Sequence, residues 1–296
     1  MNVVRSELPS FLSSRIVLQD QTVIHYRYWR PQIKTDQAVI FLHRGHEHSG
    51  RLIEPIEKLG LDDRWVFAWD ARGHGLSSGQ FDSFDVLIHD LQQFVSAIST
   101  TYEIDRRKIV FVAHSFSAVL LTEWIREYQP DLQALVLLAP AFRINLFLPF
   151  AYEAMGALNQ VFPKLKVRSF VRGSLLTRDR KSAEDYDRDK TITRSISVKA
   201  LLELKRRAIL STRAATRITV PSLLLLSGND PIVDRKYQLL FFDLLSSKKK
   251  MLRIFPGMRH DIFHELQRDD AFSLIRSFIR ELERQQELPD KSDEAA

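Results

Sequence analysis

A serine lies between a predicted buried strand and a predicted helix, where its hydroxyl could act as a nucleophile. Ser115 comes two residues after the end of the apolar run Ile109–Ala113, and a helical pattern begins directly after it. Such a turn, called a nucleophile elbow, exposes the serine oxygen near a helix N-terminus and requires small residues two positions before and after it. Ala113 and Ser117 meet that requirement, although neither is glycine. The motif alone is equally consistent with a serine that only caps a helix.

Two later loops supply an acid and a base in the chain order that an elbow needs. A serine nucleophile requires a histidine to take its proton and a carboxylate to orient that histidine. Asp230 and Asp234 follow one strand-like run, and Asp230 is our candidate acid because it is nearer the strand end. His260 follows the next such run. Asp230 could instead cap a helix that starts at the following proline. Three elements in the right order nevertheless favour a triad of Ser115, Asp230 and His260.

The loop after the third predicted strand could complete an oxyanion hole. One N–H donor would come from Phe116, the residue after the serine, and the other from Gly45, where a glycine lets the backbone approach the substrate closely. His46, Glu47 and His48 are consecutive in the same loop. That spacing does not match the His-Glu-x-x-His arrangement of a zinc-binding helix. We therefore expect neither a metal site nor a cofactor.

The elements that would position these residues alternate between short strands and longer helices. Residues Phe84 to Ile98 carry apolar side chains at helical spacing, and so do the segments that begin at Val119 and Phe272. The first two strands predict an antiparallel hairpin, and the later apolar runs are typical of parallel strands buried on both faces. The eight expected strands are Arg15–Leu18, Val23–Trp29, Ala38–His43, Trp65–Trp69, Lys108–Ala113, Ala134–Leu138, Ser222–Leu226 and Met251–Phe255. The pattern predicts an α/β protein, a mostly parallel eight-stranded sheet with helices on both faces.

The alternation is interrupted once, by a basic segment that follows the sixth strand. Residues 141–220 hold 17 Lys and Arg against 7 Asp and Glu, whereas the whole chain of 296 residues has a net charge of only +6. We interpret this segment as a helical cap inserted into a core of residues 1–140 and 221–285, followed by a polar, disordered tail at 286–296. An apolar stretch from Ile144 to Tyr152 lies beside the cations. It favours peripheral contact with anionic lipid, although a cap packed on the core would have the same composition.

The composition excludes several classes of protein. The chain has no cysteine, so disulfides and thiolate chemistry are absent. We expect no signal peptide and no membrane-spanning helix, and we place the protein in the cytoplasm, with possible peripheral contact at the inner membrane surface. Nucleic acid is not an expected partner because no binding motif accompanies the positive charge.

The motifs described above resemble the α/β-hydrolase fold, and in particular its monoacylglycerol lipase and lysophospholipase branch, which is grouped with serine aminopeptidases. The similarity runs from the second predicted strand to the last helix and includes the cap. It is carried by the segments HRGHEHSGR, WDARGHGLSSG, VAHSFSA, LLSGNDPIVD and GMRHD. The chain is also similar to the hydrolase half of bacterial proteins that join such a domain to a methyltransferase.

The resemblance implies a catalytic Ser115, Asp230 and His260 with oxyanion donors at Gly45 and Phe116. The family has His-Gly-x-Gly-Glu-His where this chain has Arg44 and His46 in the glycine positions. We expect these two side chains to crowd the acyl end of the site. The stretch Asp70–Gly75 matches a loop that we interpret as structural.

The function expected from these features is a serine hydrolase that cleaves a carboxylic ester of a monoacylglycerol or lysophospholipid through an acyl-enzyme. The same triad could serve a peptidase, a thioesterase or an acyltransferase. A different class of function is a catalytically silent member of the fold that binds a lipid or a partner protein. The departures from glycine in the elbow and at Arg44 motivate that alternative, and the complete triad opposes it.

Overall fold

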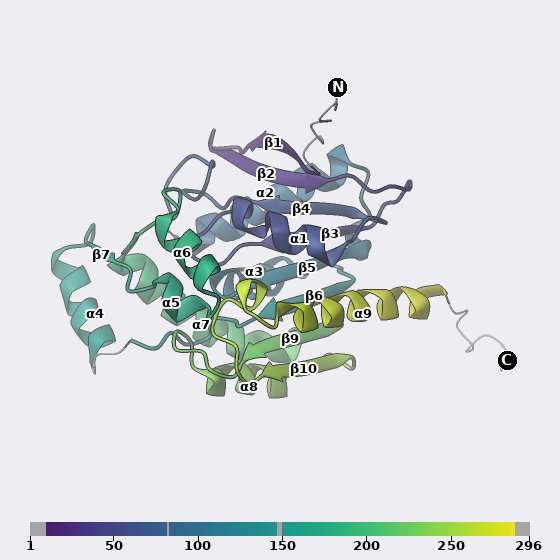
Figure 1. Cartoon of the computed structure of the whole chain (residues 1–296). Coiled ribbons are helices and arrows are strands. Elements are labelled where there is room, and N and C mark those ends of the chain that lie inside the picture. Colours follow the sequence, from purple (N-terminus) through teal and green to yellow (C-terminus); the bar gives the residue numbers. More distant parts are fainter. Residues whose placement is uncertain (1–9, 82, 147–149, 288–296) are drawn as a thin grey trace, which may run out of the picture.

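The computed structural model describes residues 10–81, 83–146 and 150–287, and its centre is an eight-stranded sheet (Figure 1). The strand order is β1-β2-β4-β3-β5-β6-β9-β10. β1 and β2 form the predicted antiparallel hairpin, β2 also pairs antiparallel with β4, and every other pairing is parallel. All eight predicted strands are present, and the mostly parallel sheet is confirmed. The strands are β1 Leu12–Val17, β2 Val23–Trp29, β3 Ala38–Leu42, β4 Trp65–Trp69, β5 Ile109–His114, β6 Ala134–Leu138, β9 Ser222–Ser227 and β10 Lys250–Phe255.

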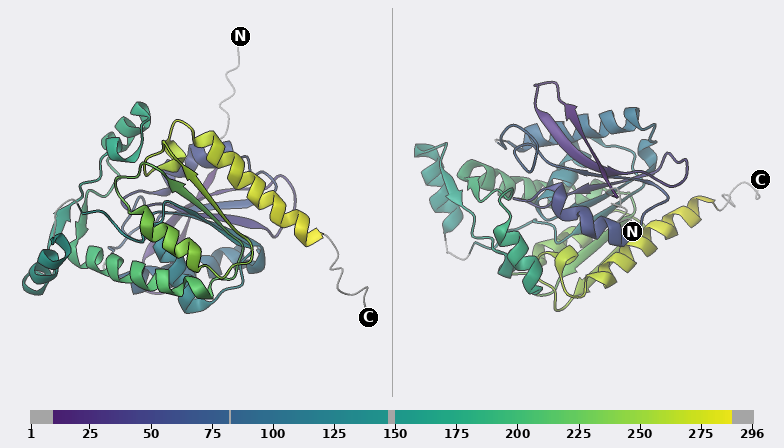
Figure 2. Two further views of the ribbon diagram at one scale, coloured as in Figure 1. Left: turned by 90° about the horizontal axis from the view of Figure 1, so that it is seen from below. Right: turned by 45° about the horizontal axis from the view of Figure 1, so that its top comes forward.

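Helices cover both faces of the sheet because successive side chains of a buried strand point to opposite sides. Ile40 and Leu42 of β3 belong to a core shared with α2, α3, α7 and α8, whereas Val39 and Phe41 pack with α1 and α9. In the left view of Figure 2, α9 (yellow) lies across the sheet from the green helices α7 and α8. The core helices are α1 Ile53–Leu59, α2 Phe84–Thr101, α3 Phe116–Tyr128, α8 Arg235–Leu244 and α9 Arg268–Glu287. Both edge strands, β1 and β10, are partly exposed.

The insertion, residues 141–220, runs between β6 and β9, after the sixth strand of the sheet as predicted. It contains four helices and a two-stranded antiparallel sheet of its own, within the described residues. Its elements are α4 Ala151–Val161, β7 Lys166–Arg168, α5 Gly173–Leu176, α6 Arg180–Arg188, β8 Ser195–Ser197 and α7 Val198–Ala214. Residues 147–149 of the predicted apolar stretch and residues 288–296 of the predicted tail lie outside the described residues. The first two residues of the predicted tail, 286 and 287, belong to α9.

The two ends of the insertion differ in how firmly they hold to the core. α4 has no buried side chain and projects from one end of the molecule (Figures 1 and 2). α7 packs along α3, where its Arg207 bonds the fully buried Glu123 at 3.0 Å and also pairs with Asp85 of α2. Ser211 donates a further hydrogen bond to Glu123 at 3.1 Å. α7 is therefore tied to the core helices by a buried polar cluster, while the division of the chain into core and cap stays a prediction.

Candidate active site

The elbow holds Ser115 in a backbone conformation that side chains rarely adopt. Ser115 has φ 57° and ψ −113°, at the junction of β5 and α3. Its N–H donates to the carbonyl of Leu138 at 2.8 Å, and its own carbonyl accepts from Ala118 and Ala141, each at 3.1 Å. Such strain persists only where surrounding structure determines it, and it is concentrated at functional sites. The strand-to-helix turn predicted for Ser115 is present, and it presents the hydroxyl at the carboxyl edge of the sheet.

The three residues predicted to form a triad lie within hydrogen-bonding distance of one another. The Ser115 hydroxyl lies 2.8 Å from Nε2 of His260, and Nδ1 of His260 lies 2.7 Å from Oδ2 of Asp230. The second carboxylate oxygen of Asp230 accepts the N–H groups of Ile232 and Val233 at 2.8 and 3.1 Å. Since a carboxylate can only accept, Nδ1 must carry the imidazole proton, and Nε2 is free to take the proton of the serine.

The alternative acid has a different role. Asp234 is the N-cap residue of α8, and its side chain accepts the N–H of Lys236 at 2.9 Å. Among the described residues, only Asp230 bonds the imidazole of His260. Asp230, which lies four residues nearer to β9 than Asp234, is thus the aspartate that the fold places beside His260, and its role as the acid stays a prediction.

The two predicted oxyanion donors line one cavity with Ser115 and lie next to each other. A Cβ atom on Gly45 would lie 3.4 Å from Cβ of Phe116, so the two backbones are adjacent. Phe116 is the first residue of α3, and the first N–H groups of a helix have no intrahelical acceptor. Among the described residues, neither N–H has a protein acceptor. Both are therefore available to a developing oxyanion.

The oxyanion loop turns through a residue in the left-handed region. The N–H of Glu47 donates to the carbonyl of Arg44 at 3.3 Å, and His46 at the third position of this turn has φ 72°. Glycine is favoured there, which explains why the resembling family has one. His46 is held by Thr193 of the insertion, whose N–H donates to the His46 carbonyl at 3.0 Å.

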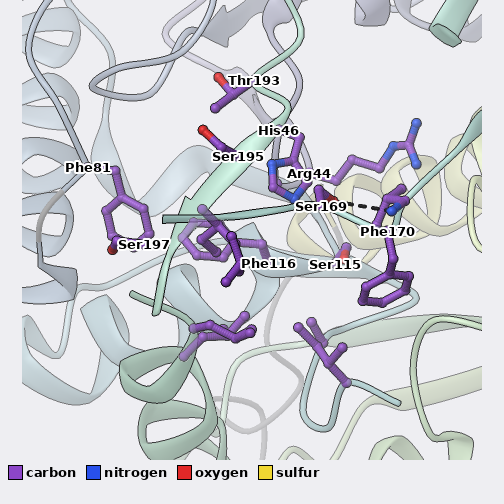
Figure 3. A pocket seen from close by; sticks show the side chains of 18 of the residues that line it. Arg44, His46, Phe81, Ser115, Phe116, Ser169, Phe170, Thr193, Ser195 and Ser197 are labelled. Carbon is purple, nitrogen blue, oxygen red and sulfur yellow. Dashed lines mark hydrogen bonds between the residues drawn. The ribbon is translucent and has the colours of Figure 1, made fainter. Parts of the chain in front are cut away.

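Because Arg44 replaces a glycine of the family, we expected its side chain to crowd the acyl end of the site. The side chain does not extend freely into the site. Arg44 is one of the residues that line the cavity, but in Figure 3 its side chain runs away from Ser115. The guanidinium pairs with Glu47 through Nε at 2.7 Å and with Asp261 at 2.8 Å. Sequence reasoning did not predict a role for Asp261, and its only signal was its position directly after His260.

Three histidines around the loop, the buried His43 and His74 and the partly buried His46, are neutral, because desolvation lowers the pKa of each imidazole. For His46 and His74 the pKa falls to about 4 and about 3. His43 donates from Nδ1 to the carbonyl of Arg44 at 2.8 Å and accepts the N–H of Ala71 on Nε2 at 3.0 Å, so both nitrogens are used. His74 donates from Nδ1 to the carbonyl of Arg72 at 3.0 Å. Its Nε2 therefore carries a lone pair, and His74 lines the cavity.

A fourth neutral histidine, which sequence reasoning missed, bonds the backbone of His260, the predicted base. His114 precedes Ser115, and its Nε2 donates to the backbone carbonyl of His260 at 2.9 Å. Burial lowers the pKa of His114 to about 4. β5, the strand that leads to Ser115, thus also bonds the loop that carries His260.

The predicted site opens on a cavity of about 590 Å³ between the sheet edge and the insertion (Figure 3). Its wall is mostly apolar, and it includes Phe81, Phe116 and Phe170. Polar groups are added by the hydroxyls of Ser169, Thr193, Ser195 and Ser197. The only charged side chains among its described lining residues are basic, and none is a carboxylate.

The histidines and carboxylates of the described residues form no group of three that could hold a metal ion. In the oxyanion loop, Glu47 bonds arginines and His48 bonds Asp189 at 2.9 Å. None of the helices described is both long enough and apolar enough to cross a membrane.

Comparison with known proteins places this geometry in a family. The family described as serine aminopeptidase, S33, matches residues 33–267. The uncharacterised protein YnbC of Escherichia coli is 37% identical over 267 residues, which are 89% of this chain and 46% of YnbC. The chain thus spans about half the length of that relative. The predicted likeness to hydrolase–methyltransferase fusions stays a prediction.

Two lipases extend the comparison. Human monoglyceride lipase is 30% identical over 258 residues, which cover 85% of this chain and 84% of the lipase. A solved structure of a soluble variant of monoglyceride lipase from Saccharomyces cerevisiae, in complex with a substrate analogue, has a TM-score of 0.80 at 16% identity. It covers 94% of this chain and 96% of the yeast chain, and at that identity it shows a shared fold. The chain therefore belongs to the serine aminopeptidase S33 family, within the monoglyceride lipase-like and lysophospholipase-like branch of the α/β-hydrolases.

Proposed function

We propose that the protein is a serine hydrolase that cleaves a carboxylic ester of a lipid-like substrate of the monoacylglycerol or lysophospholipid class. The observation that carries the proposal is the bonded chain Ser115–His260–Asp230 at the edge of an apolar cavity. A buried apolar wall suits an acyl chain, and a few polar groups suit a hydroxylated head group. The names of the relatives, two of them monoglyceride lipases, support the same substrate class.

In the proposed reaction, His260 Nε2 takes the Ser115 proton while the serine oxygen attacks the ester carbonyl. The carbonyl oxygen gains negative charge and accepts the N–H groups of Gly45 and Phe116. His260 then gives the proton to the departing alkoxide, which leaves as an alcohol and an acyl-enzyme remains. A water molecule, deprotonated by His260, attacks the acyl carbon, the C–O bond to Ser115 breaks, and His260 returns the proton to the Ser115 oxygen as the carboxylic acid leaves. Asp230 orients the imidazole and stabilises its cation throughout.

The cavity favours an ester over a peptide with a free amino terminus. An aminopeptidase must bind a substrate ammonium, and buried cations are normally matched by carboxylates. The described cavity lining offers no carboxylate, and its charged residues are arginine and lysine. This argues against the peptidase reading that the family description suggests.

Labelling with a fluorophosphonate probe tests the proposal directly. The wild-type chain is expected to be labelled, whereas the Ser115→Ala and His260→Ala variants are not, because the probe requires an activated serine. A panel of monoacylglycerols, lysophospholipids, thioesters and aminoacyl amides then identifies the acyl donor. A properly folded wild-type chain that resists the probe, with and without lipid vesicles, would favour the catalytically silent reading.

We further propose that α4 and the residues beside it bring the enzyme to an anionic membrane surface. Phe150, Val161 and Phe162 are 79%, 69% and 56% exposed, and Lys164 and Lys166 follow them. Exposed apolar side chains next to cations suit the headgroup region of a bilayer. The double variant Val161→Ser/Phe162→Ser is expected to lose sedimentation with phosphatidylglycerol vesicles.

A control for the membrane proposal lies on β1, an edge strand of the main sheet. Val17 of β1 is 61% exposed but has no part in the insertion. Val17→Ser should sediment with the vesicles like the wild type. Equal binding by the control and the α4 variant would contradict the membrane proposal, and it would leave the hydrolase proposal intact.

A further inference from the structure

One guanidinium joins the two loops that the reaction depends on. Arg44 directly precedes the oxyanion donor Gly45, and Asp261 directly follows the base His260. The Arg44 guanidinium lies 2.8 Å from the Asp261 carboxylate, and these two side chains are only 3% and 2% exposed. The ion pair is therefore shielded from water, and dissolved salt screens it less than it screens a surface pair.

The surroundings of Arg44 hold its side chain in one place. Its Nε and Nη2 atoms both bond the carboxylate of Glu47. Its guanidinium also lies 5.3 Å from the ring centre of Tyr186, a buried residue of α6, at cation–π distance. Glu47 comes from the oxyanion loop, Asp261 from the loop of the base and Tyr186 from the insertion. Arg44 thus contacts three segments near the reacting groups, namely its own oxyanion loop, the loop of His260 and the insertion.

A second arginine shares most of these partners but not the link to the base. Arg51 bonds Glu47 through Nε at 2.7 Å and lies 5.4 Å from the ring centre of Tyr186. Among the described residues, Arg44 is the only arginine paired with Asp261, whose other partner is His264 at 3.0 Å. Comparing Arg44 with Arg51 therefore isolates the connection to the loop of His260.

We propose that Arg44 is a positioning residue for the ester hydrolysis, fixing the Gly45 N–H relative to the His260 imidazole through its ion pair with Asp261. The inference rests on the proposed function. A serine hydrolase needs its oxyanion donors and its base aligned on the same carbonyl group, and small misplacements of either are costly. In the family that the sequence resembles, a glycine at this position cannot make this connection. Arg44 also provides a rigid side-chain tie for a loop whose turn contains the strained His46.

The test compares steady-state kinetics of wild type, Arg44→Gln, Arg44→Lys and Arg51→Gln on a soluble p-nitrophenyl ester. Arg44→Gln is expected to lower kcat by about 30-fold to 100-fold with KM within about twofold, because alignment acts on the transition state rather than on ground-state binding. Arg44→Lys should recover part of the loss, since it keeps a charge that can reach one carboxylate. Arg51→Gln should keep kcat within about threefold of the wild type.

A trifluoromethyl ketone measures the alignment without turnover, because its adduct with the serine places an oxyanion in the hole. Its affinity for Arg44→Gln should fall in proportion to kcat/KM. The affinity for the product fatty acid, which needs no oxyanion hole, should change by less than about twofold.

The double variant Arg44→Gln/Asp261→Asn separates positioning from the cost of an unpaired buried charge. It removes both charges, so it should fold even where Arg44→Gln alone is destabilised. If Arg44 positions the two loops, the double variant stays as slow as Arg44→Gln. Recovery of wild-type kcat in the double variant would overturn the inference, as would an equal loss in Arg51→Gln or an unchanged kcat in Arg44→Gln. A wild-type chain that neither reacts with fluorophosphonate nor cleaves any ester would instead overturn the proposed function and this inference with it.

Discussion

The side chain of Ser117 donates a hydrogen bond to the backbone carbonyl of His43, and so joins the elbow to the oxyanion loop. Ser117 is in the first turn of α3, two residues after the nucleophile, where the family pattern has glycine. Both groups are buried. The side chain that replaces glycine is therefore small enough for the turn, and it also supports the loop that presents Gly45.

Replacing Ser117 by alanine should lower the free energy of unfolding by about 1–3 kcal/mol, because it leaves a buried carbonyl without its donor. We also expect kcat to fall several-fold as the loop loosens. Urea denaturation and ester kinetics measure the two effects. Ser99→Ala is the matched control, since its buried hydroxyl has no partner among the described residues and its removal should be neutral or slightly stabilising.

The backbone strain at Ser115 predicts that two variants without the serine hydroxyl differ in stability. Glycine adopts positive φ without steric cost, whereas alanine keeps the Cβ atom that causes the strain. Ser115→Gly should therefore be more stable than Ser115→Ala by about 1 kcal/mol, after the entropy cost of glycine is subtracted. Thermal denaturation of the two variants checks this. A lower melting temperature for Ser115→Gly would mean that the elbow is not strained.

The two aspartates after β9 should differ strongly in how much kcat falls when each is replaced by asparagine. Asp230→Asn should lower kcat on the order of 10³-fold to 10⁴-fold, because an amide no longer holds the catalytic tautomer of His260. Asp234→Asn should leave kcat near the wild-type value, since asparagine caps a helix as well as aspartate does. The same esterase assay measures both, and the reverse ranking would make Asp234 the acid.

The neutral histidines predict that the protein loses stability on mild acidification. Burial lowers the pKa of His43, His46, His74 and His114, whereas unfolded histidines titrate near 6.5. The unfolded state therefore binds more protons below pH 6.5, and the free energy of unfolding falls as pH drops toward about 4. At pH 5 each histidine can remove up to about 2 kcal/mol.

Urea denaturation at pH 7.5 and pH 5.0 measures this loss in a window above the titration of the carboxylates. His114→Gln should reduce the difference between the two pH values by about the contribution of one histidine. His89→Gln is the control, because His89 is exposed on α2. A pH difference that is the same in all three proteins would show that His114 is protonated in the folded state.

The free lone pair of His74 predicts selectivity for substrates with a hydroxyl on the alcohol side. His74→Phe should lower kcat/KM for a 1-monoacylglycerol by about tenfold, the worth of one neutral hydrogen bond. The methyl ester of the same fatty acid should change by less than about twofold, because it has no hydroxyl to donate. An equal loss for both esters would assign His74 a structural role instead.

Much of the fold could be predicted because strong local patterns determine it. The predicted bounds of β2, β4 and β6 match the structure, and the fully buried strands stand out as continuous apolar runs. The order of serine, acid and histidine was readable for a similar reason, since each follows its own strand. Parallel strands bring their carboxyl ends to one edge of the sheet, so chain order implied proximity.

The remaining features depend on contacts between distant segments, which no local pattern carries. β7 and β8 are three residues each, too short for alternation to be recognised, and 26 residues separate them in the chain. Arg44 was visible as a departure from glycine, but its partner Asp261 lies 217 positions away. The left-handed turn at His46 likewise depends on Thr193. Only a folded chain brings these residues together.

The buried pair of Glu123 and Arg207 limits how the insertion could be exchanged between relatives. A chimaera that took residues 141–220 whole from another hydrolase would remove Arg207 and leave the buried Glu123 carboxylate with the partly exposed Arg126 as its one remaining arginine partner among the described residues. A graft joined at residues 140 and 197 would keep α7, and with it the arginine. An exchange of the cavity-lining part of the insertion should therefore use the shorter graft, which keeps α7 together with its partner helix α3.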